Sequence, residues 1–459
     1  MAARCAVSLP SASDRAREGV HHHEPRRFFA NTLMPRSLGI ARKSRMGLSA
    51  ILGRGMVVRR NGVSGVTEPT RVKADGRFSY RTLDPDAVKV LRRLNHHGFT
   101  AYLVGGCVRD LMLRVEPKDF DIATEATPRQ VKRLFRNSRI IGRRFRLVHV
   151  TFQDKVLDVS TFRAQVETPA DADDPMIRHD NVFGTAGEDA RRRDFTINGL
   201  FYDVRSGELI DYVGGLDDLD RRVIETIGDP WVRFREDPVR MLRAIKFAGR
   251  INFTFADDVY QAMLDCRDDL NKAAAPRLLE EIFRLLNRGG ALQSIRLLYK
   301  SGLMQVMLPE IAEDLERCFA AGIESPMWGY LEELDRRVRS GESIDHVVML
   351  ACVFLNLFDR PLYDENSQNG VRDLNLLTER LLRPIAIRLH MSRRDVYRLK
   401  QILVAQRRLA GFVKGKRRRA SIGQFMSREY FRAAWLLFKI QGETRGRFLD
   451  TIEAWEGKV

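Results

Sequence analysis

The residues best suited to chemistry are two aspartates that flank a phenylalanine. Asp119 and Asp121 enclose Phe120, and apolar Ile122 and Ala123 follow, which predicts a strand over 119–123. Successive strand side chains point to opposite faces, so both carboxylates would share one face. Two adjacent carboxylates repel each other unless a cation lies between them, and Mg²⁺ prefers oxygen ligands and bridges phosphates. A pair of solvated aspartates on an edge strand is the alternative.

A glycine pair lies shortly before these aspartates. Gly105 and Gly106 separate a predicted strand over 99–104 from a predicted helix over 108–113. Glycines let the backbone approach a phosphate closely, and a helix start offers free N–H groups to it. Arg109 adds a cationic donor. A simple strand-to-helix turn is the alternative.

A third carboxylate has two candidates. Asp158 interrupts an apolar strand predicted over 156–162, where an unpaired buried acid would be costly. If this strand adjoins the one that carries Asp119, Asp158 completes a three-carboxylate cluster able to hold metal and accept a proton. Asp194 follows three arginines that end at Arg193, and such a run can clamp a triphosphate or form a solvated surface.

A helix start further along the chain gathers charged residues. Pro238 suits the first helical position and Asp237 the cap before it. Arg240 and Arg243 are three residues apart, so they share a helix face. They can hold a nucleotide base or its phosphates, or form a solvated ridge.

The elements around these residues predict an α+β fold, with a small mixed-sheet head followed by an all-helical body. Strands and helices alternate up to about residue 215, and residues 167–190, rich in Asp, Gly and Pro, are predicted to form a loop. We expect four segments: a basic extension over 1–75 that is disordered or mis-assigned, the head over 76–215, a helical neck over 216–300, and a helical body with a basic tail over 301–459.

The composition limits the class of protein. Lys and Arg exceed Asp and Glu by a formal +18, with a sequence pI near 10.0, which favours a polyanionic partner such as nucleic acid. No apolar run is long enough to span a membrane. The five cysteines are scattered, which argues against a disulfide framework or a structural zinc site and favours a reducing, cytoplasmic compartment.

Taken in this order, the motifs resemble those of the bacterial class II nucleotidyltransferases, the group of poly(A) polymerases and CCA-adding tRNA nucleotidyltransferases. The segments that carry the resemblance are Gly105–Asp110, Asp119–Asp121, Arg193–Asn198, Glu236–Ala244, and Pro276–Leu278 with Glu281. The chain departs from the group at Cys107, where a small residue is usual.

Two segments resemble the poly(A) polymerases in particular. Residues 140–150, Ile-Ile-Gly-Arg-Arg-Phe-Arg-Leu-Val-His-Val, resemble the stretch that separates them from the CCA-adding enzymes. A basic cluster near the C-terminus resembles their RNA-gripping tail; it comprises Lys414, Lys416, Arg417, Arg418 and Arg419.

The resemblance implies roles for individual residues. Asp119 and Asp121 would bind the catalytic metals. Gly105, Gly106, Arg109 and Arg193 would contact the nucleotide, and Asp237, Arg240 and Arg243 would lie at its base. For the third carboxylate the resemblance allows Asp158 and Asp194 and favours Asp194, whereas the strand pattern alone favours Asp158.

The resemblance also implies an activity: template-independent transfer of AMP from ATP to RNA 3′ ends, with two Mg²⁺ ions and release of pyrophosphate. The partners would be RNA 3′ ends and ATP, with no membrane, and a monomer is favoured. A CCA-adding tRNA nucleotidyltransferase and a non-catalytic RNA-binding protein on a polymerase fold are the alternatives. An HD-type phosphohydrolase is disfavoured, because His179-Asp180 lies in the predicted loop.

Overall fold

The structure is a computed structural model in which one mixed sheet forms the centre of the head. It describes residues 68–74, 76–142, 146–153, 155–164, 182–363, 374–411 and 419–458. The sheet has eight strands in the order β1-β8-β7-β2-β3-β6-β5-β4. The strands are β1 (Thr70–Lys73), β2 (Ala101–Val104), β3 (Ile122–Thr124), β4 (Ser138–Ile141), β5 (Leu147–Thr151), β6 (Val156–Thr161), β7 (Leu200–Asp203) and β8 (Glu208–Asp211). All pairs are antiparallel except β3 with β6.

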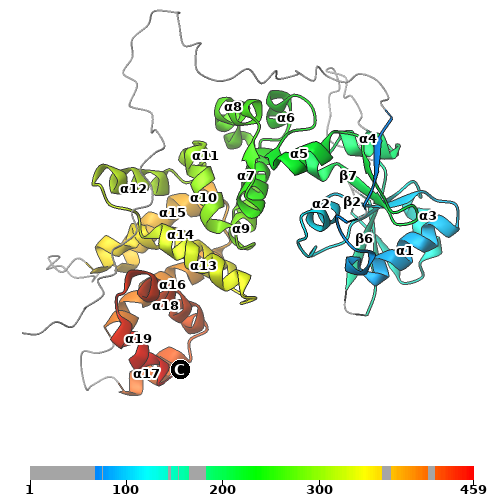
Figure 1. The fold of residues 1–459 in the computed structure, drawn as a ribbon. Coiled ribbons are helices and arrows are strands. Elements are labelled where there is room, and N and C mark those ends of the chain that lie inside the picture. Colours follow the sequence, from blue (N-terminus) through cyan, green and yellow to red (C-terminus); the bar gives the residue numbers. More distant parts are fainter. Residues whose placement is uncertain are drawn as a thin grey trace, which may run out of the picture. The chain divides into compact units, whose positions relative to one another are not determined.

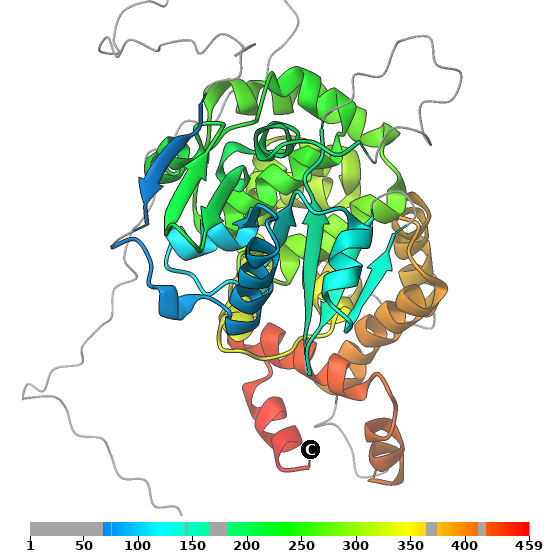
Figure 2. The ribbon, with the colours of Figure 1, turned by 90° about the vertical axis from the view of Figure 1, so that its right-hand side faces the viewer.

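Five short helices belong to the head. They are α1 (Pro85–His96), α2 (Gly106–Met112), α3 (Pro128–Leu134), α4 (Ala186–Arg191) and α5 (Gly215–Arg221). Local sequence sets their starts: the Asp84 carboxylate caps α1, and Thr127 and Gln130 form a capping box on α3. The helices α1 and α3 lie on the same face of the sheet (Figure 2).

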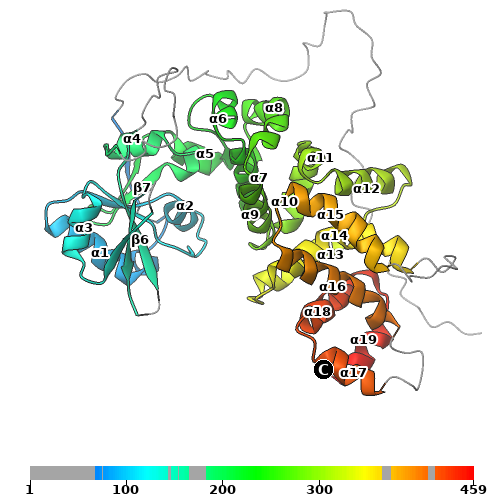
Figure 3. The same ribbon diagram turned by 180° about the vertical axis from the view of Figure 1, so that it is seen from behind.

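The chain after α5 is almost entirely helical (Figures 1 and 3). Its first helices are α6 (Pro230–Glu236), α7 (Val239–Ile251), α8 (Asp257–Cys266), α9 (Ala275–Leu286) and α10 (Ala291–Lys300). Then follow α11 (Leu303–Met307), α12 (Pro309–Ala320), α13 (Met327–Arg339), α14 (His346–Tyr363), α15 (Leu374–Arg388), α16 (Arg393–Ala410), α17 (Arg419–Met426), α18 (Phe431–Arg445) and α19 (Leu449–Glu456). A two-residue ribbon, β9 (Val223–Ile224) with β10 (Thr254–Phe255), interrupts the helices.

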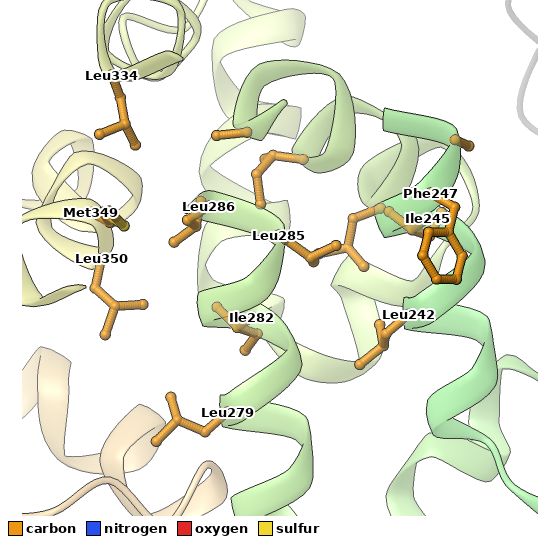
Figure 4. Packing of buried hydrophobic residues seen from close by; sticks show 14 of the residues in the cluster. Leu242, Ile245, Phe247, Leu279, Ile282, Leu285, Leu286, Leu334, Met349 and Leu350 are labelled. Carbon is orange, nitrogen blue, oxygen red and sulfur yellow. The ribbon is translucent and has the colours of Figure 1, made fainter. Parts of the chain in front are cut away.

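Leucine-rich faces hold these helices together. Leu242 and Ile245 of α7 face Ile282 and Leu285 of α9, and the opposite side of α9 turns Leu286 toward α13 and α14 (Figure 4). All five side chains are buried. Burying apolar surface on both sides of α9 is therefore the main force that joins α7 to the helices that follow.

Three expectations require correction. The strand expected over 119–123 begins only at Ile122, so Asp119 and Asp121 lie in the segment that leads into β3. The loop expected over 167–190 contains α4, capped by Thr185, while 165–181, with His179 and Asp180, lies outside the described residues. The head sheet begins at Thr70, before the expected boundary at 75, because β1 pairs with β8.

The α+β class itself is confirmed, as is the strand expected over 156–162, which is β6. Within the described residues no helix is both long and apolar enough to cross a bilayer.

Glu225, directly after β9, gives a test of the packing around that strand. Its carbonyl accepts the Thr196 N–H at 3.0 Å, while burial, with Asp258 and Asp218 nearby, raises the pKa of its carboxyl to about 7. The folded state thus holds this proton to higher pH than the unfolded state does. The cost of ionising it is absent below about pH 4.5, grows as the pH rises, and is complete above about pH 7.

We therefore expect Glu225→Gln to raise the free energy of unfolding by about 2 kcal/mol at pH 8 and to change it little at pH 4.5. Denaturant melts at the two pH values measure this. Glu313→Gln, at an exposed position on α12, is the control and should change neither value. An equal effect of Glu225→Gln at both pH values would contradict the assignment.

Candidate active site

Three carboxylates gather at one end of the parallel strand pair. The register aligns Ile122 of β3 with Val159 of β6, so Asp121 and Asp158 precede matched positions on adjacent strands. Asp119 lies two residues earlier, and both Asp119 and Asp121 are exposed. The adjacency that was a condition for including Asp158 is therefore met.

The Asp121 carboxylate carries the electrostatic strain of this group. Protein atoms crowd it although part of its surface reaches solvent, and this burial raises the pKa of its carboxyl. The charge of Asp158 raises the pKa further, as does that of Asp119, while the Arg193 guanidinium opposes them. The site therefore holds an excess of negative charge that a cation would relieve.

Asp158 has one protein contact of its own. His149 on β5 lies opposite it in the register, with Nε2 3.1 Å from Oδ1. Both side chains remain partly open to solvent. His149 therefore positions the Asp158 carboxylate and leaves part of it accessible to solvent.

The turn at Gly105 lies between the carboxylate group and the guanidinium of Arg193. Gly105 has φ of +72°, and an added Cβ would lie 2.7 Å from Nη1 of Arg193, so both conformation and space require glycine. The N–H of Val104 donates to the Asp121 carbonyl at 3.1 Å, which sets the turn beside that aspartate. Gly106 opens α2. The structure thus brings Gly105, Arg193 and Asp121 together.

Arg193 is held in place by an acid that sequence analysis missed. Asp189 on α4 is fully buried; its Oδ2 receives Nη2 of Arg193 at 2.9 Å, and its other oxygen pairs with Arg192. Burial opposes ionisation, but the two arginines hold the pKa of the Asp189 carboxyl below its usual value. The spacing of four residues was a usable signal, but only if a helix had been expected there.

Cys107, at the point of departure from the family pattern, is buried against the same turn. Its thiol donates to the Val104 carbonyl at 3.3 Å. Burial, aided by the charge of Asp121, raises the pKa of this thiol to about 12, so it is protonated at neutral pH. The cysteine fills space in the position of a small residue.

Arg109 is buried and fully paired. It is 2% exposed and donates to the carboxylate of Asp110 at 2.7 Å and to Oδ1 of Asn198 at 2.5 Å. Its guanidinium carbon lies 4.8 Å from the centre of the Phe247 ring on α7. The structure therefore places Arg109 in the packing between α2 and α7.

Asp194 occupies a similar bridging position. Its Oδ2 receives two N–H groups of Arg243 at 2.8 and 2.6 Å, while its Oδ1 receives the Phe195 N–H and the Asn198 amide. Burial opposes ionisation, but Arg243, Asn198 and the Phe195 N–H hold the pKa of its carboxyl below the usual value. Both carboxylate oxygens of Asp194 are hydrogen-bonded. The Asp194–Arg243 pair therefore links the segment before β7 to α7.

The remaining pair lies where α6 meets α7. Asp237 binds Arg277 of α9 at 2.8 Å and accepts the Val239 N–H at 3.3 Å. The expected cap is wrong by one residue, because α7 starts at Val239 with Pro238 in the cap position and Asp237 caps the end of α6. Arg240 donates to the Arg233 carbonyl and to Glu236, both at 2.8 Å. Asp237 and Arg240 thus share one end of α7, whereas Arg243 is drawn away to Asp194.

The donor set fits Mg²⁺. Among the described residues, no three His, Cys, Asp or Glu side chains are arranged to hold a metal by themselves. Magnesium, however, is usually bound through one or two carboxylates together with substrate phosphates. The uncompensated carboxylates Asp119 and Asp121 beside the glycine turn supply that kind of site.

Part of the predicted RNA-binding surface lies outside the described residues. This holds for Lys414, Lys416, Arg417 and Arg418, and for the side chain of Arg419. Arg143, Arg144 and Phe145 of the 140–150 segment lie outside them as well.

Known proteins resemble this chain in sequence over most of its length. Residues 101–225 match the family described as the poly A polymerase head domain, and residues 252–315 match the probable RNA and SrmB-binding site of polymerase A. Poly(A) polymerase I of Salmonella typhi is 36% identical over 395 residues, which cover 82% of this chain and 83% of that protein. The CCA-adding enzyme of Bacillus velezensis is 35% identical over 219 residues, 48% of this chain and 54% of that protein.

Solved structures agree on the fold. The CCA-adding enzyme of Bacillus stearothermophilus in complex with CTP aligns with a TM-score of 0.57 and 25% identity, over 82% of this chain and 89% of that one. A tRNA nucleotidyltransferase complexed with a primer tRNA and an incoming ATP analog aligns with a TM-score of 0.54 and 23% identity, over 80% and 98%.

The fold and the matched domains define a class II nucleotidyltransferase. Within that class, the chain belongs to the family of bacterial poly(A) polymerases and CCA-adding enzymes.

The Asp194–Arg243 pair predicts a stability effect. The Asp194 side chain is largely buried and Arg243 is partly exposed, so solvent screens part of the loss, and Asp194→Asn should lower the free energy of unfolding by about 2 kcal/mol. Thermal melting checks this. Asp220→Asn, which breaks an exposed pair with Arg77, is the matched control and should cost less than about 1 kcal/mol. Equal melting temperatures of Asp194→Asn and wild type would show that the pair does not stabilise the fold.

Proposed function

We propose that this protein adds adenylates from ATP to the 3′ ends of RNA without a template and releases pyrophosphate. The observation that carries the proposal is the group Asp119, Asp121 and Asp158 beside the Gly105 turn, in a chain 36% identical to poly(A) polymerase I over most of its length. Transfer of a nucleotidyl group needs positioned phosphates and neutralised charge more than it needs a covalent intermediate.

Asp119 and Asp121 hold the metal in this proposal. Two Mg²⁺ ions bound there with the triphosphate supply charge neutralisation and a more acidic 3′-hydroxyl. Arg193, fixed by Asp189 at the glycine turn, binds a phosphate of ATP. Asp237 and Arg240 face the base from the start of α7. The exposed 3′-hydroxyl of the RNA attacks the α-phosphate in line.

We propose Asp158 as the third carboxylate. It is the carboxylate whose charge acts most strongly on Asp121, and its contact with His149 leaves it accessible. Asp194, which the resemblance favoured, spends both oxygens on Arg243, Asn198 and the Phe195 N–H. The roles of Arg109 and Arg243 are accordingly proposed to be positional, with Gly105 and Gly106 leaving room for the phosphates.

The remaining features of the proposal follow from relatives and charge. The basic cluster that ends at Arg419 grips RNA through its phosphates, independently of sequence. We further propose a monomer that works in the cytoplasm on cellular RNA. A CCA-adding enzyme is the second candidate, supported by relatives such as that of Bacillus velezensis.

Primer extension tests the proposal. Purified protein with Mg²⁺ receives either an unstructured oligoribonucleotide or a tRNA that lacks its 3′ end, with each nucleoside triphosphate in turn. We expect long extension of the plain RNA with ATP alone. Asp119→Ala should lower the rate by about 10³-fold or more, since one carboxylate contributes several kcal/mol of barrier, whereas Asp220→Asn should not.

Addition of only three nucleotides to the tRNA, with a need for CTP, would replace the proposal with CCA addition. Binding of RNA without incorporation from any nucleotide would make the protein a non-catalytic RNA binder.

A further inference from the structure

A pocket lies far along the chain from the catalytic carboxylates, where three helices meet. Arg296 of α10, the start of α13 and the end of α18 line it, and its volume is about 250 Å³. That is below the range of about 300–1,000 Å³ for ligand pockets, so the pocket admits at most one nucleotide unit. Side-chain contacts between α13 and α18, such as Arg337 with Glu443 at 2.7 Å, hold its walls together.

One polar group in this pocket lacks a partner. Ser325 is 4% exposed, and its hydroxyl makes no hydrogen bond within the described part of the chain. Ser325 lines the pocket directly before α13. Buried hydroxyls are normally hydrogen-bonded, and this one is enclosed by protein atoms beside the pocket, so a ligand atom would reach it after rotation about χ1.

The pocket also offers an aromatic face and two guanidinium groups. The Arg296 guanidinium carbon lies 5.5 Å from the centre of the Trp328 ring. Arg445 lies across the pocket, with Nη1 3.5 Å from the Tyr330 hydroxyl. The first turn of the 13-residue helix α13 adds backbone N–H groups and the positive end of its dipole.

The charge balance excludes a simple anion site. Glu324 and Glu332 line the same pocket, so its two formal positive charges are matched by two negative ones. A bare phosphate would meet as much repulsion as attraction. A nucleotide would offer a partner to each kind of group: a base beside the Arg296–Trp328 pair, a phosphate for the arginines, and hydroxyl or amino groups that donate to the glutamates.

We propose that this pocket binds one nucleotide of the RNA strand, away from the strand's reacting 3′ end. The proposal rests on the proposed function in one respect, namely that RNA is the source of the nucleotide. A free mononucleotide has the same chemistry, and the experiment separates the two sources.

The test measures binding of fluorescein-labelled oligo(A) by anisotropy, with the full chain, in EDTA and without ATP, so that no extension occurs. We expect Arg296→Gln and Trp328→Leu to raise Kd about fivefold or more, the range for loss of one stacked base. Arg336→Gln is the matched control, because Arg336 lies on the same helix but is exposed and paired with Glu333. It should leave Kd near the wild-type value.

Titration with AMP, followed by tryptophan fluorescence, is the second arm. Fluorescence quenching by AMP that Trp328→Leu abolishes, with unchanged RNA affinity in both pocket variants, would support the pocket but reassign it to a free nucleotide. Unchanged RNA affinity and no AMP response would overturn the proposal. Melting curves identify variants that fail to fold, and Arg445→Gln then replaces them.

These outcomes are separate from those for the proposed function. If the wild-type protein extends RNA with ATP and all pocket variants bind RNA normally, only the pocket proposal fails. A wild type that binds no RNA removes both.

Discussion

The arrangement of the site depends on a ring of buried and partly buried hydrogen bonds that starts and ends on α7. The ring runs from Arg243 to Asp194, Asn198, Arg109, Asp110 and Arg250. Because Arg243 and Arg250 lie on the same helix, the ring fixes α7 against both the turn after β2 and the segment before β7. Its three arginines share two aspartates and the Asn198 amide, so loss of an aspartate leaves at least one arginine without its charged partner.

This pairing explains which acids remain for chemistry. Arginines form ion pairs with Asp110, Asp189 and Asp194. Far fewer partners contact Asp119, Asp121 and Asp158. The protein thus separates acids that build the scaffold from acids that hold excess negative charge. That excess is the condition for binding magnesium with a triphosphate, and the raised pKa of Asp121 is its direct electrostatic sign.

Local patterns predicted much of the fold. The glycine pair indicated the junction of β2 with α2, and the apolar run over 156–162 indicated β6, because turns and strand patterns act over a few residues. The segment around Asp119 was wrong as a strand because alternation does not show where strand pairing begins. The roles of Asp194 and Arg109 could not be predicted, since Arg243 is 49 residues from Asp194 and Asn198 is 89 from Arg109. Only the fold brings such partners together.

The central claim is that Asp158, not Asp194, completes the catalytic carboxylates. The most direct test is the single-turnover rate of adenylate addition by Asp158→Asn, with the melting temperature measured on the same sample. The account predicts a rate at least about 10²-fold below wild type, a loss of about 2.7 kcal/mol or more of transition-state stabilisation, and an unchanged melting temperature. A near-normal rate in a folded Asp158→Asn protein would contradict it.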